Sequence, residues 1–311
     1  MIKRTIYSMP SGYRTDLTIE GYCFGSTEHK TVAIVGSMRG NEVQQLYVCS
    51  QLVKILKKLE SQGKIRPECG IEVIPCVNPF SVNIGERFWA MDGTDINRMF
   101  PGYDKGETTQ RIASGVFTHL QGFDYGIQFA SHYLRGEFIP HVGVIKTDFS
   151  DTESARAFGL PYVVMRHPKP IDTTTLNYNW QIWNTKAYTV ITRSTERLDI
   201  ESAKQGVTAI LRFLANNGLI DDAIHGGHVS SVLNHDALTV LRAPAAGIYR
   251  PLVSPGQQVH AGDVLADILH PCEGHVLERV VSPIDATVFF AFDEPLVMQR
   301  QLVFELIREW H

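Results

Sequence analysis

The sequence predicts an α/β fold with a largely parallel sheet flanked by helices, followed by a smaller β domain. Short apolar, β-branched runs alternate with helical patterns between residues 31 and 216, which is typical of strands joined by crossover helices. From residue 239 the sequence pattern changes to short β-type runs separated by glycine and proline. The 311 residues, 44% of them hydrophobic and 20% charged, suffice for one large domain and a smaller one. We therefore predict domains at 1–220 and 239–311, joined by a polar linker at 221–238.

The amino-terminal part of the large domain begins with a strand, a turn and a helix. Residues 31–35 form the apolar strand, Gly36-Ser37 follow, and residues 42–59 carry apolar side chains at helical spacing. The next strand, at 70–77, ends at Asn78-Pro79, because proline neither donates to a ladder nor continues a helix.

A long segment rich in glycine, proline, aspartate and asparagine follows at residues 80–106. It has no sustained period and predicts an ordered loop, the kind of segment that commonly carries function. The remaining predicted elements are a helix at 107–120 capped by Thr108 or Thr109, strands at 124–130 and 187–192, and a helix at 200–216.

Charge and cysteine usage narrow the classes of partner. The formal net charge is -4, without a basic run that would favour nucleic acid or an anionic membrane surface. No apolar run approaches the roughly 20 residues that span a bilayer, and the first residues lack the apolar core of a signal peptide. The five cysteines contain no CxxC pair and predict free thiols. We expect a cytoplasmic protein whose partners are small molecules or proteins.

The small β domain resembles the barrel-sandwich module of biotinyl and lipoyl carriers. The resemblance lies in residues 247–253, 255–259 and 262–265. No lysine stands at the exposed turn where a carrier attaches its cofactor, since residues 282–286 read Ser-Pro-Ile-Asp-Ala. We predict a structural or lid role for this domain.

One segment of the long loop identifies a family. Residues 95–102 read Asp-Ile-Asn-Arg-Met-Phe-Pro-Gly and resemble the substrate-binding DxNRxFPG loop of the succinylglutamate desuccinylase/aspartoacylase family. Gly40-Asn41-Glu42, Asn78-Pro79 and Arg87 recur at the family's spacing, so the resemblance covers most of the chain. It implies a zinc-carboxypeptidase-like fold and zinc-dependent hydrolysis of N-acyl amino acids.

The same resemblance assigns substrate-binding roles. Asn97 and Arg98 fall on the residues that hold the substrate's carboxylate, and a guanidinium offers a planar fork of donors for such a group. Arg87 falls on an arginine that faces the reacting carbonyl, where positive charge stabilises an oxyanion. The alternative is a loop held by its own salt bridges, such as Asp95 with Arg98.

The family's zinc ligands and base are replaced at three of four positions. In the resemblance, zinc is bound by two histidines and a glutamate, and a second glutamate activates water. Glu42 is retained, but the first histidine position is Arg39, the second is Ala130 and the base position is Ile191. Arginine has no lone pair to donate and a methyl group binds no metal. We therefore predict that the usual zinc mechanism is absent.

Two alternatives keep a catalytic role open. A relocated metal centre could use Glu42 and His132, with His141 or His167 as a third ligand. A lone histidine near a strand end is more commonly a surface or hydrogen-bonded residue. Ser131-His132 and Cys76 offer nucleophile or base groups, although their spacing forms no legible triad.

The replacements suggest a binding function. We hypothesise that Arg39 acts as a fixed cation beside Glu42 and, with Arg87, Arg98 and Arg193, favours anionic ligands. The leading prediction is a family member that binds an N-acyl amino acid or similar small carboxylate without zinc-dependent hydrolysis. It would act as a ligand-binding protein, as a homo-oligomer or as the non-catalytic partner of an active homologue. The alternative is a deacylase with relocated metal ligands, the only case in which zinc is expected.

Overall fold

The computed structural model describes residues 1–13, 15–130, 135–194 and 196–308. It divides into two compact units, one formed by Met1–Ser131 with Pro140–Val232 and the other by His132–Ile139 with Leu233–His311. These boundaries differ from the predicted domains at 1–220 and 239–311 in two respects. Strand β6 (Glu137–Phe138) pairs with β16 of the small unit, and strand β10 (Ser231–Asn234) lies in the predicted linker and joins the large sheet.

The large unit is built on a mixed sheet of nine strands. Their order is β1 (Ile2–Met9), β2 (Leu17–Gly25), β4 (Gly70–Cys76), β3 (Val32–Ser37), β5 (Tyr125–Phe129), β9 (Lys186–Ile191), β7 (His141–Ile145), β8 (Tyr162–Arg166) and β10. The central strands β4, β3, β5 and β9 run parallel, as do β7 and β8. Antiparallel pairs join β1 to β2, β2 to β4 and β7 to β9. The predicted mixed, largely parallel sheet is confirmed.

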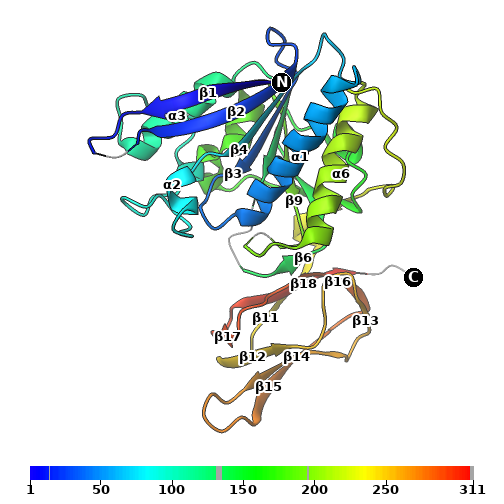
Figure 1. Cartoon of the computed structure of the whole chain (residues 1–311). Coiled ribbons are helices and arrows are strands. Elements are labelled where there is room, and N and C mark those ends of the chain that lie inside the picture. The colour runs from blue at the N-terminus through cyan, green and yellow to red at the C-terminus, as the bar shows by residue number, and fades with distance from the viewer. Residues whose placement is uncertain (14, 131–134, 195, 309–311) are drawn as a thin grey trace. The chain divides into compact units, whose positions relative to one another are not determined.

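Helices cover both faces of this sheet (Figure 1). Helices α1 (Val43–Ser61) and α6 (Ile200–Asn216) pack on one face, while α3 (Thr108–Leu120) and α5 (Leu176–Ile182) pack on the other. The shorter helices are α2 (Pro79–Val82), α4 (Thr152–Arg156), η1 (Ile96–Arg98) and η2 (Pro170–Thr174).

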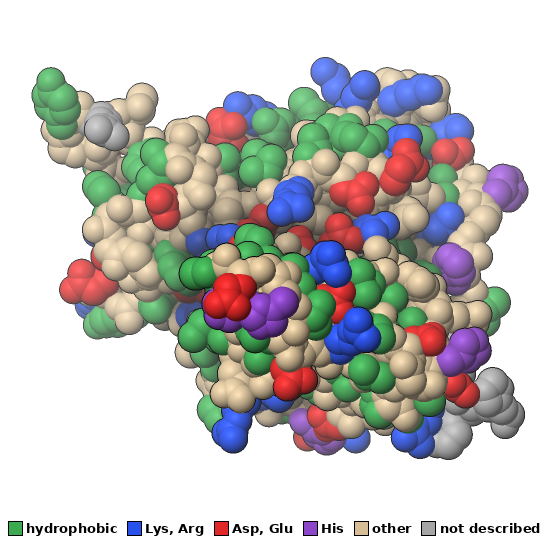
Figure 2. Space-filling model, turned by 90° about the horizontal axis from the view of Figure 1, so that it is seen from below, with side chains coloured by type: hydrophobic (Ala, Val, Ile, Leu, Met, Phe, Trp, Pro, Cys, Tyr) green, Lys and Arg blue, Asp and Glu red, His purple; other side chains and the backbone are tan. Residues whose placement is uncertain are grey.

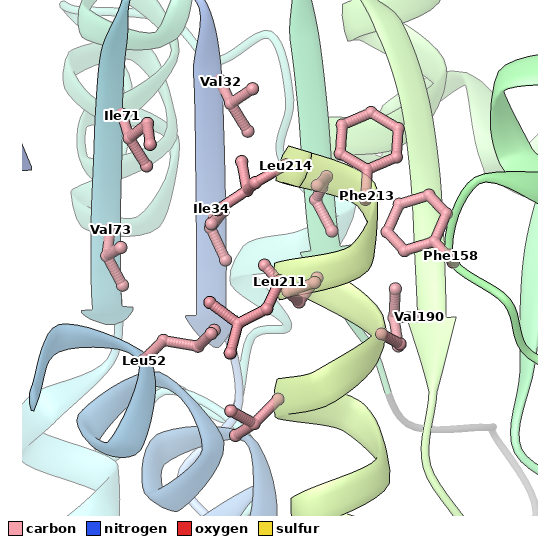
Figure 3. Close-up of a cluster of buried hydrophobic side chains, with 14 of the residues drawn as sticks. Val32, Ile34, Leu52, Ile71, Val73, Phe158, Val190, Leu211, Phe213 and Leu214 are labelled. Carbon is pink, nitrogen blue, oxygen red and sulfur yellow. The ribbon is translucent and has the colours of Figure 1, made fainter. Parts of the chain in front are cut away.

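The central strand β3 shows why its sequence is an unbroken apolar run. Val32 and Ile34 face α1 and α6, within the cluster drawn in Figure 3. Ala33 and Val35 point to the opposite face and pack with α3 and α5. Successive side chains of a strand alternate between faces, so a strand covered on both sides must be apolar at every position.

Two short helices lie at the start of and within the predicted loop at 80–106, and polar side chains cap both of them. Asn78 Oδ1 accepts from Ser81 N at the start of α2, and Asp95 Oδ1 accepts from Asn97 N at the start of η1. The predicted cap of α3 at Thr108 or Thr109 is wrong. The N-cap is Glu107, whose N–H donates to Gln110 Oε1, because the carboxylate and amide side chains form a capping box.

The small unit consists of two antiparallel sheets. One contains β11 (Thr239–Arg242), β18 (Leu302–Arg308), β16 (Ala286–Ala291) and β13 (Gln258–Val259), with β6 added beside β16. The other contains β15 (Val276–Val281), β14 (Val264–Leu269), β12 (Gly247–Pro251) and β17 (Leu296–Val297). The 3-10 helix η3 (His235–Ala237) precedes β11.

Surface charge is mixed. On the face that Figure 2 shows, Lys and Arg side chains are interspersed with Asp and Glu side chains. Within the described part of the chain, no helix has the length and apolar character needed to cross a bilayer.

Candidate functional site

The turn that follows β3 folds around the buried carboxylate of Glu42. Glu42 Oε2 accepts from the backbone N–H of Met38 at 2.9 Å and of Arg39 at 3.1 Å. Ser37 Oγ donates to the carbonyl of Glu42 at 2.5 Å. Buried carboxylates need such partners, because an ion removed from water without them is costly. Glu42 therefore organises the turn at the carboxyl end of β3.

Gly40 brings this turn against a second segment. A Cβ at this position would lie 2.3 Å from the carbonyl oxygen of Glu86 and from the carbonyl carbon of Ser81. Gly40 N also donates to the carbonyl of Arg87 at 3.2 Å. Only glycine permits this approach, which places the backbone of Arg87 beside the turn.

Arg39 lies between two carboxylates. Its Nη1 donates to Glu42 Oε1 at 3.0 Å, and its Nε and Nη2 donate to Asp95 Oδ2 at 3.1 and 2.8 Å. The side chain is only 5% exposed. Burial alone would lower the pKa of Arg39, but Glu42 and Asp95 outweigh it and the net pKa is raised. The predicted pair of Arg39 with Glu42 is present, and the half-buried Asp95 completes a triad.

The segment from Asp95 to Gly102 is held by contacts with α5 and the chain before it. Asn97 Oδ1 accepts from Leu176 N at 3.3 Å, so this side-chain oxygen binds the start of α5. Arg98 Nη1 donates to the carbonyl of Ile171 at 3.1 Å, and its Nε lies 4.0 Å from Asp95 Oδ2. Burial lowers the pKa of Arg98, whose side chain is still 25% exposed.

A glutamate that the sequence analysis missed also lies in the cluster. Glu196 Oε1 accepts from Arg87 Nη1 at 3.2 Å and from Asn41 Nδ2 at 2.8 Å. Burial and the neighbouring Arg39 lower the pKa of Arg87, against the opposing effect of the carboxylates. The position of Glu196 in the short connection between β9 and α6 could have indicated this residue from the sequence. The resemblance instead placed the family's glutamate, without gaps, at Ile191.

The connection that carries Glu196 is anchored at its far end. Asp199 N donates to Gln44 Oε1 at 3.0 Å, and Gln44 Nε2 donates to the carbonyl of Asp199 at 3.1 Å. The Asp199 side chain caps α6 by accepting from the N–H groups of Glu201 and Ser202. Glu196 therefore lies only a few residues before a position that is fixed to α1.

The remaining predicted positions are distributed along strand ends. Ala130 follows β5 and donates its N–H to the carbonyl of Val190 at 3.3 Å, and Ile191 is the last residue of β9. His141 pairs in register with Ile191 and with Tyr162. His167 is exposed and follows the last residue of β8. The strand extends four residues, or about 13 Å, from Tyr162, the partner of His141, to Arg166. The two histidines therefore do not lie together.

The predicted nucleophile or base groups are Ser131-His132 and Cys76, and Arg193 is a predicted anion-binding residue. Ser131 and His132 lie outside the described residues. Burial raises the pKa of Cys76 to about 12, which leaves roughly one thiol in 10⁵ ionised at pH 7. Cys76 is therefore a neutral, half-buried thiol. Arg193 donates its backbone N–H to Ser202 Oγ at 2.6 Å.

The residues at the family's ligand positions do not fit zinc. Arg39 presents a cation, Ala130 a methyl group, and both oxygens of Glu42 already accept hydrogen bonds. Outside residues 14, 131–134, 195 and 309–311, no three or more His, Cys, Asp or Glu side chains are grouped to hold a metal. The relocated centre would use His132, which is one of these excluded residues.

Fold and site together define a hydrolase-like α/β protein with a charged cluster at the carboxyl ends of its central strands. Residues 28–216, well over half of the chain, match the model of the succinylglutamate desuccinylase/aspartoacylase catalytic domain. The chain belongs to the succinylglutamate desuccinylase/aspartoacylase family, which confirms the resemblance seen in the sequence.

Three relatives illustrate the similarity. The chain is 28% identical over 145 residues to an N-alpha-acetyl-L-2,4-diaminobutyric acid deacetylase of Halomonas elongata, a match over 44% of this chain and 40% of the deacetylase. It thus spans less than half the length of this curated relative. A succinylglutamate desuccinylase/aspartoacylase structure from Rhodobacter sphaeroides aligns with TM-score 0.79 and 20% identity, covering 99% of this chain and 96% of that one. The product-bound ectoine utilization protein EutE (DoeB) of Ruegeria pomeroyi aligns with TM-score 0.76 and 16% identity, covering 94% and 89%. These structural similarities support the fold.

Proposed function

We propose that this protein binds a small carboxylate, of the N-acyl amino acid class, without the zinc-dependent hydrolysis associated with its family. The observation that carries the proposal is the buried Arg39, which lies between Glu42 and Asp95. The cation satisfies the glutamate that would otherwise ligate a metal. It also ties the turn after β3 to the loop that begins at Asp95.

Arg39 can replace the charge of a metal but not its chemistry. A guanidinium neutralises nearby carboxylates through fixed hydrogen bonds, and its pKa stays far above neutral pH. It offers no open coordination position and does not lower the pKa of a bound water, which is how zinc generates a nucleophile. The scaffold therefore keeps its electrostatic organisation while the hydrolytic step has no equivalent.

Arg98 is the best-placed group for a ligand carboxylate. Its contacts are one hydrogen bond to a carbonyl and a long 4.0 Å approach to Asp95, in contrast to the closely paired Arg39. A quarter of the side chain is exposed, so part of its donor fork faces outward. The acyl amino acid in the name of the Halomonas relative supports this ligand class, because such molecules carry one carboxylate beside an amide.

The test combines metal content with binding. Protein purified without chelator is analysed for zinc, and N-acetyl-L-alanine binding is titrated calorimetrically for the wild type, Arg98→Ala and the exposed control Arg66→Ala. We expect far less than one zinc per chain, no hydrolysis with added zinc, and binding that Arg98→Ala weakens about 10- to 100-fold, since hydrogen bonds to charged groups contribute about 1.5–3 kcal/mol. Arg66→Ala should bind like the wild type.

One zinc per chain with hydrolysis of the probe would overturn the proposal in favour of a deacylase with relocated ligands. Absence of both zinc and carboxylate binding, together with co-purification of a homologue that retains the zinc-binding histidines, would favour a non-catalytic partner role instead.

A further inference from the structure

Among the described residues, the ion pairs of the charged cluster join equal numbers of cationic and anionic side chains. Three guanidinium groups, from Arg39, Arg87 and Arg98, lie among the carboxylates of Glu42, Asp95 and Glu196. The pKa of Arg87 is influenced by Arg39 and by all three carboxylates, so these groups form one electrostatic system. A ligand carboxylate would add a fourth negative charge to a partly buried site, which is unfavourable unless one of the three leaves.

Glu196 is the carboxylate that can leave at least cost. Its side chain is 25% exposed, compared with 15% for Asp95 and 0% for Glu42. Glu42 and Asp95 also accept hydrogen bonds from backbone N–H groups, and withdrawal of either would leave those donors buried and unpaired. The bonds that Glu196 makes with Arg87 and Asn41 run between side chains, and its carboxylate side chain is the most exposed of the three.

We propose that Glu196 is an internal substitute for the ligand's carboxylate. In the unliganded protein it occupies donors of Arg87 and Asn41. A bound small carboxylate, which Arg98 also contacts, displaces Glu196 and takes those donors. The exchange keeps the cluster neutral and requires only a local rearrangement, because the connection is fixed at Asp199 by Gln44. Glu196 thereby lowers the apparent affinity by the fraction of time its carboxylate occupies the site. This inference rests on the proposed carboxylate-binding function.

The experiment compares Glu196→Gln and Glu196→Ala with the wild type. Calorimetric titration uses N-acetyl-L-alanine and, separately, acetate. If the carboxylate of Glu196 is displaced in one molecule of ten, its removal should strengthen binding about tenfold. Glu201→Gln is the matched control, because that carboxylate is exposed and pairs with the neighbouring Lys204 on α6. The control should bind like the wild type.

The outcomes separate this inference from the function on which it rests. If the wild type binds the probe and Arg98→Ala weakens binding, but both Glu196 variants bind equally to or more weakly than the wild type, the internal-substitute role is wrong and the carboxylate site stands. If no variant binds either probe, both are wrong. A complex structure with Glu196 turned away from Arg87 and a ligand carboxylate in its place would support the inference directly.

Discussion

At the scale of the residue, one arginine joins two carboxylates of the candidate site. The Arg39 guanidinium makes hydrogen bonds to Glu42 and to Asp95, and Asp95 lies 56 residues farther along the chain than Arg39. Arginine suits this position because its donors are fixed in a plane and remain charged when buried. The sequence predicted the pair of Arg39 with Glu42, and the structure adds the second carboxylate, Asp95.

Replacing Arg39 by alanine should destabilise the protein strongly. The buried Glu42 and the half-buried Asp95 would lose their common cation, and removing one partner of a buried ion pair costs about 3–5 kcal/mol. The free energy of unfolding in urea would measure the loss. Arg66→Ala provides the control, because its pair with Asp221 is exposed and should contribute at most about 1 kcal/mol. A loss below about 1 kcal/mol for Arg39→Ala would show that the triad is not a structural centre.

At the scale of the element, the site depends on turns that bring strand ends and loops together. The turn after β3, the segment of Arg87 and the connection after β9 meet because Gly40 allows close backbone contact and Gln44 holds Asp199. Sequence periodicity predicted the central strands β3, β4, β5 and β9 and the long helices α1, α3 and α6, since each has a strong apolar pattern. It did not predict the outer strands β1, β2, β7, β8 and β10. It missed α2 and η1, because short capped helices depend on individual side-chain hydrogen bonds rather than on a period.

The substitution Gly40→Ala tests the close approach. The added methyl would overlap the backbone of Ser81 and Glu86 at about 2.3 Å, so one segment must move and the Arg87 side chain with it. We expect a loss of about 1–3 kcal/mol in thermal or urea unfolding and weaker binding of N-acetyl-L-alanine. Gly12→Ala is the matched control, because a methyl group added there would have nothing within 4 Å. Equal behaviour of the two variants would argue against the required approach.

At the scale of the whole molecule, a second buried ionic group joins three elements away from the candidate site. Glu72 on β4 is paired with Arg4 on β1 and lies 3.5 Å from His119 Nε2 on α3. Burial raises the pKa of Glu72, but hydrogen bonds with His119 and Arg4 outweigh this effect and the net pKa lies below its ordinary value of 4.5. The folded state therefore holds this carboxylate in its ionised form.

This arrangement predicts a loss of stability in acid. Because the folded pKa is lowered, the stabilisation from Glu72 is fully present above pH 4.5 and is lost as pH falls below that value toward the folded pKa. Urea unfolding between pH 7 and pH 3 should show this decline, and Glu72→Gln should make its slope shallower, whatever its effect at pH 7. Asp172, paired with Arg166, also has a lowered pKa and should leave part of the slope in place. An unchanged slope in Glu72→Gln would contradict the assignment.

The small unit has no lysine to which a cofactor could be attached. Its two antiparallel sheets agree with the predicted small β domain, and Lys204 is the last lysine of the chain. A cofactor attached through a lysine amide therefore has no acceptor anywhere in this unit. The structural or lid role remains a prediction.

The sequence by itself determined the fold class and the family, because these follow from local pattern and motif. From side-chain type it also predicts that Arg39, Ala130 and Ile191 do not support zinc catalysis. Only the tertiary structure decided which charges pair. Asp95 turned out to bind Arg39 more closely than Arg98, and Glu196 joined Asn41 across 155 residues of sequence. Such pairs depend on where strand ends and turns meet in space, and electrostatic energy depends on distance and burial rather than on position along the chain.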